Sequence, residues 1–275
     1  MLILVSTPIG NLSDISKRAI ETLNNADIIA CEDTRTSASL FSLVGIKAKK
    51  LIPYHEHNAD EIRPKIISYL EKGLLVALVS DAGTPLISDP GYRLVRECRQ
   101  KGLEVSTVPG ANAVLSALQL SGLPSDAFLF AGFLPHKQSA RKNHLSTFKS
   151  VPATLIFYET ANRLIDSLKD ILDILGNREM SVVREITKKF EETKSGFVSD
   201  LIAYYEENDQ PKGEIVLVID RKSENIEEIN IEDLILKTLE TSSVKDTAEI
   251  VSKISGYPKK EIYKKALDLK NGKKV

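Results

Sequence analysis

Short apolar runs alternate with longer mixed stretches along the first 120 residues. The runs predict strands at Leu2–Val5, Asp27–Cys31, Lys50–Pro53, Leu74–Val79 and Leu103–Val108. The stretches between them predict helices at residues 15–23, 37–44, 60–72, 91–101 and 113–120, with Ser13 or Asp14 capping the first. This alternation is typical of a parallel, doubly wound α/β sheet, which we assign to a domain over residues 1–120.

A second α/β domain is predicted over residues 121–222, after a linker at Ser121–Ser125. Its elements are shorter and less regular, which favours a mixed sheet. We expect strands at 127–131, 153–158, 181–184 and 214–219, and helices at 140–148, 163–175 and 198–207.

The last part of the chain predicts a small helical module. Residues 221–230 are charged and poor in apolar residues, which is typical of a tether. Helical patterns follow at 232–239, 244–254 and 259–269, and they fit a helix-turn-helix-like module over residues 231–275. A packing appendage or a dimer arm would give the same pattern.

Composition excludes several classes of protein. With 37 basic and 38 acidic residues among 275, the net charge is −1, so any nucleic-acid surface must be a local patch. Cys31 and Cys98 have no metal-site spacing and indicate a reducing, cytoplasmic location. The apolar N-terminus has no basic region before it and reads as a strand, and no run approaches the length of a membrane span.

The loop Ser80–Gly91 is the strongest candidate for a binding site. It follows the buried strand at 74–79, and open α/β sheets bind ligands at the carboxyl ends of their strands. Gly83 would let the backbone approach a ligand closely. Asp81 and Asp89 can accept hydrogen bonds from hydroxyl or amino groups. An ordinary turn between a strand and a helix is the alternative.

Loops at many strand ends together resemble one family, the 16S ribosomal RNA ribose 2′-O-methyltransferases of the tetrapyrrole methylase superfamily. The resemblance spans essentially the whole chain. The matching segments include Thr7-Pro8-Ile9-Gly10-Asn11-Leu12, Glu32-Asp33-Thr34-Arg35, His55-Glu56-His57-Asn58, 79–91, 108–111, Gly132-Phe133-Leu134-Pro135, 157–159, 184–188, Lys212-Gly213-Glu214 and 263–267.

The resemblance implies S-adenosylmethionine as cofactor, held in a cleft between the two α/β domains. The residues carried over to cofactor binding are Pro8, Ile9, Gly10, Asp81, Ala82, Gly83, Thr84, Asn112, Ala113, Glu159, Gly213 and Glu214. The family commonly has a small residue at the position of Asn112, although an amide there can still hydrogen-bond. Asp81 or Glu159 would attract the cationic sulfonium.

Candidate catalytic residues lie beyond the second strand. Glu32 or Asp33 could take the proton of a ribose hydroxyl, and Arg35 could pair with a phosphate. An internal Asp–Arg pair that fixes the loop is the alternative. His55, two residues from His57, could act as a base or contact RNA. The sequence does not favour a metal site here, because no third ligand lies nearby.

A basic segment at 137–144 is the best candidate for an RNA surface. Lys137, Arg141 and Lys142 could bind phosphates, together with Arg163 and Lys188 from the same domain. A solvated helix face would show the same charges.

The resemblance therefore implies methylation of a ribose in small-subunit ribosomal RNA, of a cytidine in the decoding region, by a cytoplasmic homodimer. The partner would be 16S ribosomal RNA or the small subunit itself. Two other functions remain open: methylation of a tetrapyrrole or another small molecule, and RNA binding without catalysis by an assembly protein.

Overall fold

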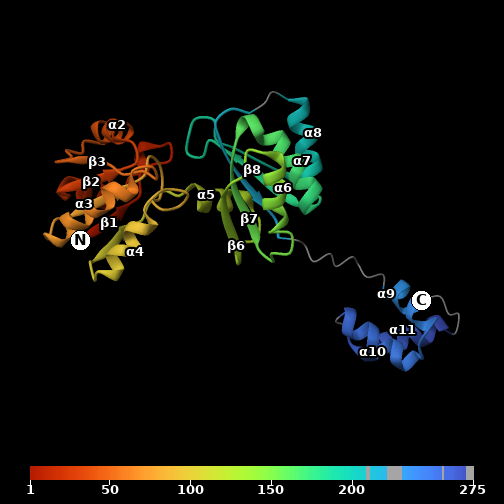
Figure 1. The fold of residues 1–275 in the computed structure, drawn as a ribbon. Coiled ribbons are helices and arrows are strands. Elements are labelled where there is room, and N and C mark those ends of the chain that lie inside the picture. The colour runs from red at the N-terminus through yellow and green to blue at the C-terminus, as the bar shows by residue number, and fades with distance from the viewer. Residues whose placement is uncertain (209–210, 222–230, 256, 271–275) are drawn as a thin grey trace. The chain divides into compact units, whose positions relative to one another are not determined.

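The chain forms two compact units in a computed structural model that describes residues 1–208, 211–221, 231–255 and 257–270. The first unit is Met1–Arg221 and contains two sheets; the second is Lys222–Val275 and contains three helices (Figure 1). Residues 222–230 of the expected tether lie outside the described residues.

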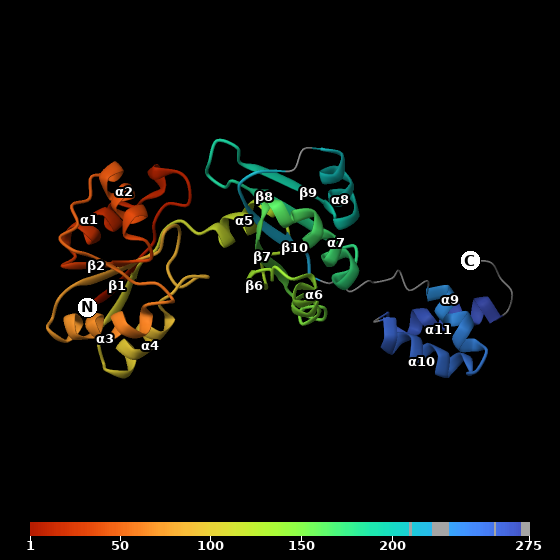
Figure 2. The ribbon, with the colours of Figure 1, turned by 45° about the horizontal axis from the view of Figure 1, so that its top comes forward.

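The first sheet is parallel throughout, as predicted. Its order is β3 (Leu51–Pro53), β2 (Ile28–Cys31), β4 (Val76–Val79), β1 (Leu2–Val5) and β5 (Val105–Val108). Two helices cover each face: α1 (Lys17–Asn25) and α2 (Thr34–Val44) on one, α3 (Ala59–Glu71) and α4 (Tyr92–Gln100) on the other (Figure 2). The doubly wound prediction is confirmed.

The cap predicted for the first helix is wrong. Residues Leu12–Asp14 form a short 3₁₀ helix, η1, and α1 begins only at Lys17. Ser16 is the cap, because its Oγ accepts a hydrogen bond from the amide of Ala19 at 3.1 Å.

The second sheet is mixed, again as predicted. Its order is β6 (Phe128–Phe133), β7 (Thr154–Thr160), β10 (Glu214–Ile219), β8 (Glu179–Arg184) and β9 (Glu192–Phe197). β6 and β7 run parallel, and the other neighbours run antiparallel. The pattern missed β9, since this edge strand is polar and buries none of its residues fully.

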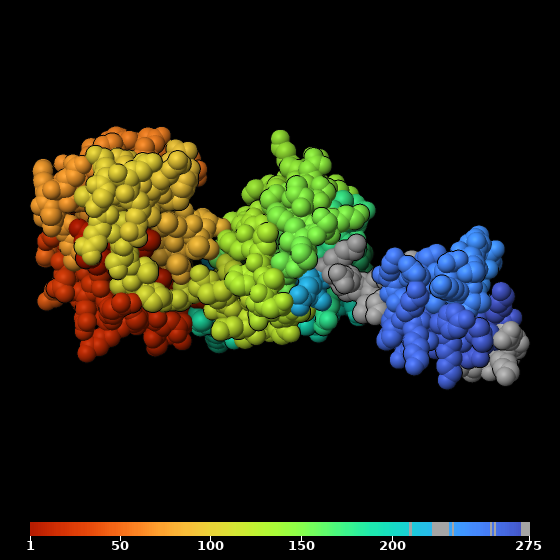
Figure 3. Space-filling model, turned by 90° about the horizontal axis from the view of Figure 1, so that it is seen from below, coloured from red at the N-terminus to blue at the C-terminus, as the bar shows by residue number. Residues whose placement is uncertain are grey.

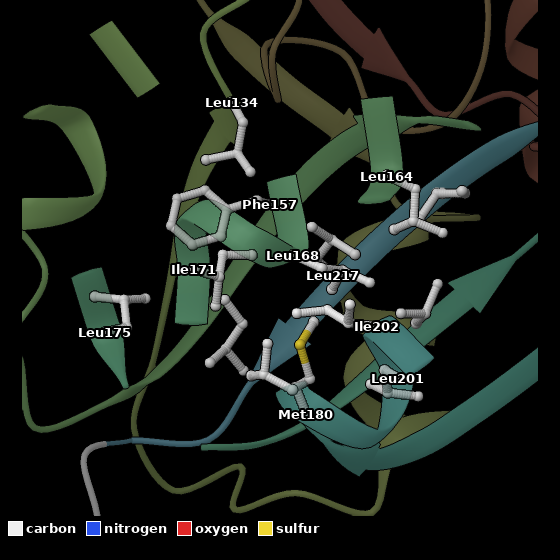
Figure 4. Close-up of a cluster of buried hydrophobic side chains, with 14 of the residues drawn as sticks. Leu134, Phe157, Leu164, Leu168, Ile171, Leu175, Met180, Leu201, Ile202 and Leu217 are labelled. Atoms are coloured by element: carbon white, nitrogen blue, oxygen red, sulfur yellow. The ribbon is translucent and has the colours of Figure 1, made fainter. Parts of the chain in front are cut away.

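Helices cover both faces of the second sheet. On one face lie α6 (Gln138–Ser146), α7 (Leu164–Leu175, after the short 3₁₀ helix η2, Ala161–Arg163) and α8 (Val198–Glu207). Leu134, Phe157, Leu168, Ile171 and Leu217 belong to the core between them (Figure 4).

The opposite face is covered by α5 (Ala113–Ser121), which we expected in the first domain. Its Val114, Ala117 and Leu118 instead pack against side chains of β7, β8 and β10. The helix that ends the first domain in sequence therefore completes the core of the second sheet. The boundary at 120/121 was predicted from the linker sequence and stays a prediction. The packing of α5 groups this helix with the second sheet.

The second unit has its own core. It consists of α9 (Ile231–Leu239), α10 (Val244–Ser255) and α11 (Lys259–Lys270), drawn in blue in Figure 3. The buried apolar side chains of its core include those of Ile235, Ala248, Val251, Ile262 and Ala266. Among the described residues, no helix is both long enough and apolar enough to span a bilayer.

Candidate active site

A pocket of about 480 Å³ lies in the first unit, where the carboxyl ends of β1, β2 and β4 meet the second sheet. Its volume falls within the range of small-molecule sites. Residues of both sheets line it: Ile9, Glu32, Asp81, Ala82, Gly83, Thr84, Ile87, Ser88, Asp89, Asn112, Ala113, Phe133, Tyr158, Glu159, Thr160, Ile186, Gly213, Glu214, Ile215 and Val216.

Most of the predicted cofactor residues meet here. Pro8 and Gly10 do not line the pocket. Pro8 is buried, and Gly10 lies against the loop between β8 and β9, where a Cβ would come within 2.5 Å of Cγ of Lys188. Gly10 therefore serves the contact between the two halves of this unit.

Gly83 joins two loops of the pocket. Its carbonyl accepts the amide of Thr7 at 2.9 Å, and its amide donates to the carbonyl of Thr7 at 3.1 Å. Its φ is +80°, and a Cβ would stand 3.1 Å from Cγ2 of Ile9. Both polar groups of the Gly83 backbone therefore bind the neighbouring loop, and Gly83 still lines the pocket. That a ligand approaches this backbone closely stays a prediction.

Thr84 and Asn112 also hold the pocket together. Oγ1 of Thr84 donates to the carbonyl of Ala111 at 3.1 Å. Oδ1 of Asn112 accepts the amide of Leu115 at 3.0 Å and so caps α5. The capped N-terminus of α5, with its partial positive charge, thus opens on the pocket.

Three carboxyl groups line the pocket on the side of the first sheet: Glu32, Asp81 and Asp89. Burial raises the pKa of Glu32 above its usual value, with a contribution from the charge of Asp81. Burial, reinforced by the charges of Glu32 and Asp81, raises the pKa of Asp89 to about 6. Oδ1 of Asp81 accepts the amide of Asp33 at 3.1 Å, which links the loops after β2 and β4.

Asp33 and Arg35 form the internal pair that we gave as an alternative. Oδ1 of Asp33 accepts the amide of Arg35 at 2.7 Å and caps α2, and Oδ2 pairs with the guanidinium at 2.7 Å. Side-chain hydrogen bonding from Arg35 lowers the pKa of Asp33 to about 2, which makes it a poor proton acceptor. Neither residue lines the pocket, and neither does His55.

Glu159 reaches the pocket, but its carboxylate is already satisfied. It is buried and pairs with the guanidinium of Arg163, and it accepts hydrogen bonds from the amide of Thr160 at 2.6 Å and from the hydroxyl of Ser167. Because Arg163 neutralises Glu159, the attraction to a sulfonium that we expected falls to the carboxylates of the first sheet. Arg163 is likewise not an open phosphate ligand.

The basic segment does not form the open surface that we expected. Arg141 is only 3% exposed; Nε and Nη2 both lie 2.7 Å from Oδ2 of Asp170, so the exposed placement is wrong. Lys142 pairs with Asp173 at 2.8 Å, whereas Lys137 is exposed. Lys188 pairs with Glu185 and with Glu214, at 2.9 and 2.8 Å.

Several pocket residues were missed from the sequence. Tyr158 and Phe133 contribute an aromatic wall, and burial raises the pKa of the Tyr158 hydroxyl to about 12. Ser88, in the loop after β4, has a φ of +65°. Strain of this kind gathers at functional sites, but a sequence gives no signal for it beyond the Gly- and Pro-rich composition of the loop. Among the residues that the structure describes, no group of three or more His, Cys, Asp or Glu side chains is placed so that it could hold a metal ion.

Comparison with known proteins identifies the family. The family model described as Tetrapyrrole (Corrin/Porphyrin) Methylases matches residues 1–202. The chain belongs to the tetrapyrrole methylase family. A second model, described as RsmI C-terminal HTH domain, matches residues 227–270.

Close relatives of this chain share the name Ribosomal RNA small subunit methyltransferase I. The protein of Mesorhizobium japonicum is 48% identical over 98% of this chain and 92% of its own length. That of Escherichia coli O157:H7 is 42% identical over 97% and 94%.

Solved structures share the fold at low identity. Diphthine synthase matches with a TM-score of 0.61 at 15% identity, over 80% of this chain and 89% of its own. Uroporphyrin-III C-methyl transferase from Thermus thermophilus, solved with S-adenyl homocysteine, matches with a TM-score of 0.53 at 19% identity, over 80% and 96%.

Proposed function

We propose that this member of the tetrapyrrole methylase family transfers a methyl group from S-adenosylmethionine to small-subunit ribosomal RNA. The observation that carries the proposal is near-full-length similarity to relatives named for that reaction. The matching tail model supports it, because the similarity includes the C-terminal helices as well as the methylase core. The finer proposal is that the acceptor is the ribose 2′-hydroxyl of a cytidine in the decoding region.

The pocket fits the cofactor. Apolar side chains of Ile9, Ile186 and Val216 offer walls for an adenine. Glu32 and Asp81 favour a cationic ligand, and the N-terminus of α5 favours a carboxylate. When bound, S-adenosylmethionine supplies an electrophilic methyl group.

Asp89 is the best proton acceptor in the pocket for a ribose hydroxyl. Its pKa of about 6 lies close to physiological pH, so it is ionised at neutrality and still basic enough to accept a proton. Asp33 cannot take this role, because its pKa is about 2 and its carboxylate is occupied by Arg35. Glu32, beside Asp89 in the pocket, would then hold the positive charge of the cofactor.

Methyl transfer from labelled cofactor tests the proposal directly. The purified chain is incubated with S-adenosylmethionine and, separately, with deproteinised 16S ribosomal RNA, with 30S subunits and with uroporphyrinogen. Label in either RNA-containing sample is expected, and ribose analysis of the product then identifies the acceptor atom. Label only in the tetrapyrrole would replace the proposal with the small-molecule function; label in none would favour a binding protein.

We further propose that the enzyme is a homodimer that works in the cytoplasm, where ribosomal RNA is made and assembled. Light scattering at micromolar concentration checks the first part. A mass near the 30.4 kDa of one chain would contradict the dimer.

A further inference from the structure

An irregularity in β6 places an aromatic side chain at the pocket. Phe130 pairs with Ile156 and Phe133 pairs with Tyr158, so β6 holds one residue more than β7 between these pairs. In a regular strand, residues 130 and 133 would point to opposite faces. The bulge, with Gly132 at a φ of +71°, brings both rings onto Tyr158, at centroid distances of 4.8 and 5.2 Å.

Phe133 is the exposed end of this aromatic cluster. Phe130 and Tyr158 are partly buried, whereas Phe133 is 56% exposed while it lines the pocket. Its ring thus has one face or edge against Tyr158 and much of its remaining surface in solvent. A single exposed hydrophobic side chain does not by itself require a partner, but this ring lies at the rim of the pocket, where its free surface is open to a ligand.

The segment after Phe133 is held rigidly. The carbonyl of Leu134 accepts a hydrogen bond from Nη1 of Arg163 at 3.1 Å. The carbonyls of Pro135 and His136 accept from Nη1 of Arg141, whose charge is balanced by buried Asp170. Arg141, which is buried, and Arg163, whose side chain is 15% exposed, therefore fix the loop between Phe133 and the exposed Lys137.

The same position adjoins the proposed proton acceptor. A Cβ on Gly132 would lie 3.6 Å from Oγ of Ser88, the residue before Asp89. Phe133 and Asp89 line the same pocket from opposite sheets. Whatever stacks on Phe133 therefore lies next to the place where a ribose must present its hydroxyl.

We propose that Phe133 is a stacking platform for an unpaired nucleobase of the RNA substrate, and that Lys137 binds a phosphate of the same strand. The proposal rests on the proposed function and adds a specificity element to it. Exposed aromatic rings bind single-stranded RNA by stacking, without reading the base, and a nearby lysine adds a salt-dependent contact. The platform would hold the target or its neighbour out of a helix while its ribose faces Asp89.

RNA binding by four full-length variants tests the platform. Phe133→Ala removes the ring, Phe133→Leu keeps an apolar side chain, and Phe133→Trp keeps a stacking surface. Phe128→Ala is the matched control, because Phe128 is 42% exposed on the same strand but does not line the pocket. The probes are a short fluorescent oligocytidine and an oligomer of the same length with abasic riboses.

The Kd for oligocytidine should rise about tenfold in Phe133→Ala and Phe133→Leu, and stay near the wild-type value in Phe133→Trp and Phe128→Ala. The Kd for the abasic oligomer should be the same in all. Equal oligocytidine affinity in Phe133→Ala and wild type would overturn the platform, and so would a loss confined to S-adenosylmethionine, which would make Phe133 part of the cofactor wall. Because binding is measured without turnover, this result is independent of whether wild type methylates RNA.

Discussion

Gly83 and Gly73 share a backbone angle but not a neighbourhood. Both have a φ of +80°, yet a Cβ on Gly83 would meet Ile9, whereas nothing lies within 4 Å of one on Gly73. Alanine at either position should cost about 1–2 kcal/mol of folding free energy for the left-handed conformation. Only Gly83→Ala should also weaken S-adenosylmethionine binding, because it pushes Ile9 in the pocket wall. Thermal melts and calorimetric titration measure both; equal cofactor affinity in the two variants would contradict this role of Gly83.

The raised pKa of Asp89 gives the reaction a pH profile. A base must be ionised, so kcat/KM for the cofactor should fall as pH drops through about 6. Bound cofactor adds positive charge nearby and lowers the pKa of Asp89. The fall in kcat, which reports the cofactor-bound enzyme, should therefore occur at a lower pH than the fall in kcat/KM. Asp89→Asn should lower turnover by about 10²–10⁴-fold and remove both of these falls from the residual activity. A wild-type profile that is flat between pH 5 and 8 would exclude Asp89 as the base.

At the scale of elements, the α6–α7 pair depends on Arg141 and Asp170. Their side chains are 4% and 2% exposed, so Arg141→Met leaves the buried carboxylate of Asp170 with only Gln138 at 3.1 Å and Lys142 at 3.6 Å. The free energy of unfolding should fall by about 3 kcal/mol, and Arg141→Met with Asp170→Leu should restore most of it.

Denaturant titration measures the loss, with Lys137→Ser as the exposed control. That control should leave stability unchanged and reduce the salt slope of RNA affinity by about one. If Arg141→Met were as stable as wild type, the pair would not hold the loop after Phe133.

The elements differ in how far a sequence can predict them. The central parallel strands β2 and β4 were predictable because each is a short apolar run buried on both faces. β9 and the bulge in β6 were not, since the first is a polar edge and the second depends on pairing with β7. Arg141 looked like a surface charge because its partner, Asp170, lies on another helix 29 residues away.

The same limit applies to the site. Loops at strand ends indicated where it lies, and most predicted cofactor residues do line the pocket. The roles of the individual carboxylates could be assigned only from the structure. The Asp33 carboxylate is occupied because it caps α2, and burial raises the pKa of Asp89 to about 6. The sequence gives the residue types, but it does not show which carboxylates are already paired with an arginine, as Asp33 and Glu159 are.

For the whole molecule, the pocket and the C-terminal helices belong to different units. Every lining residue lies before 217, and the second unit has its own buried core. A chain that ends at Arg221 should therefore bind S-adenosylmethionine with an affinity close to that of the full chain. Calorimetric titration of the two proteins checks this; a truncated chain that folds but does not bind would show that the helices support the pocket.

The packing of α5 also sets an order on synthesis. The strands and helices of the first sheet are complete once Val108 has left the ribosome, but α5 has no core of its own to join. Its partners on β10 appear about 100 residues later, which at about 5–20 residues per second is a wait of about 5–20 seconds. During that interval the apolar side of α5 stays uncovered. A chaperone that acts during synthesis would therefore have to protect this helix until β10 has been made.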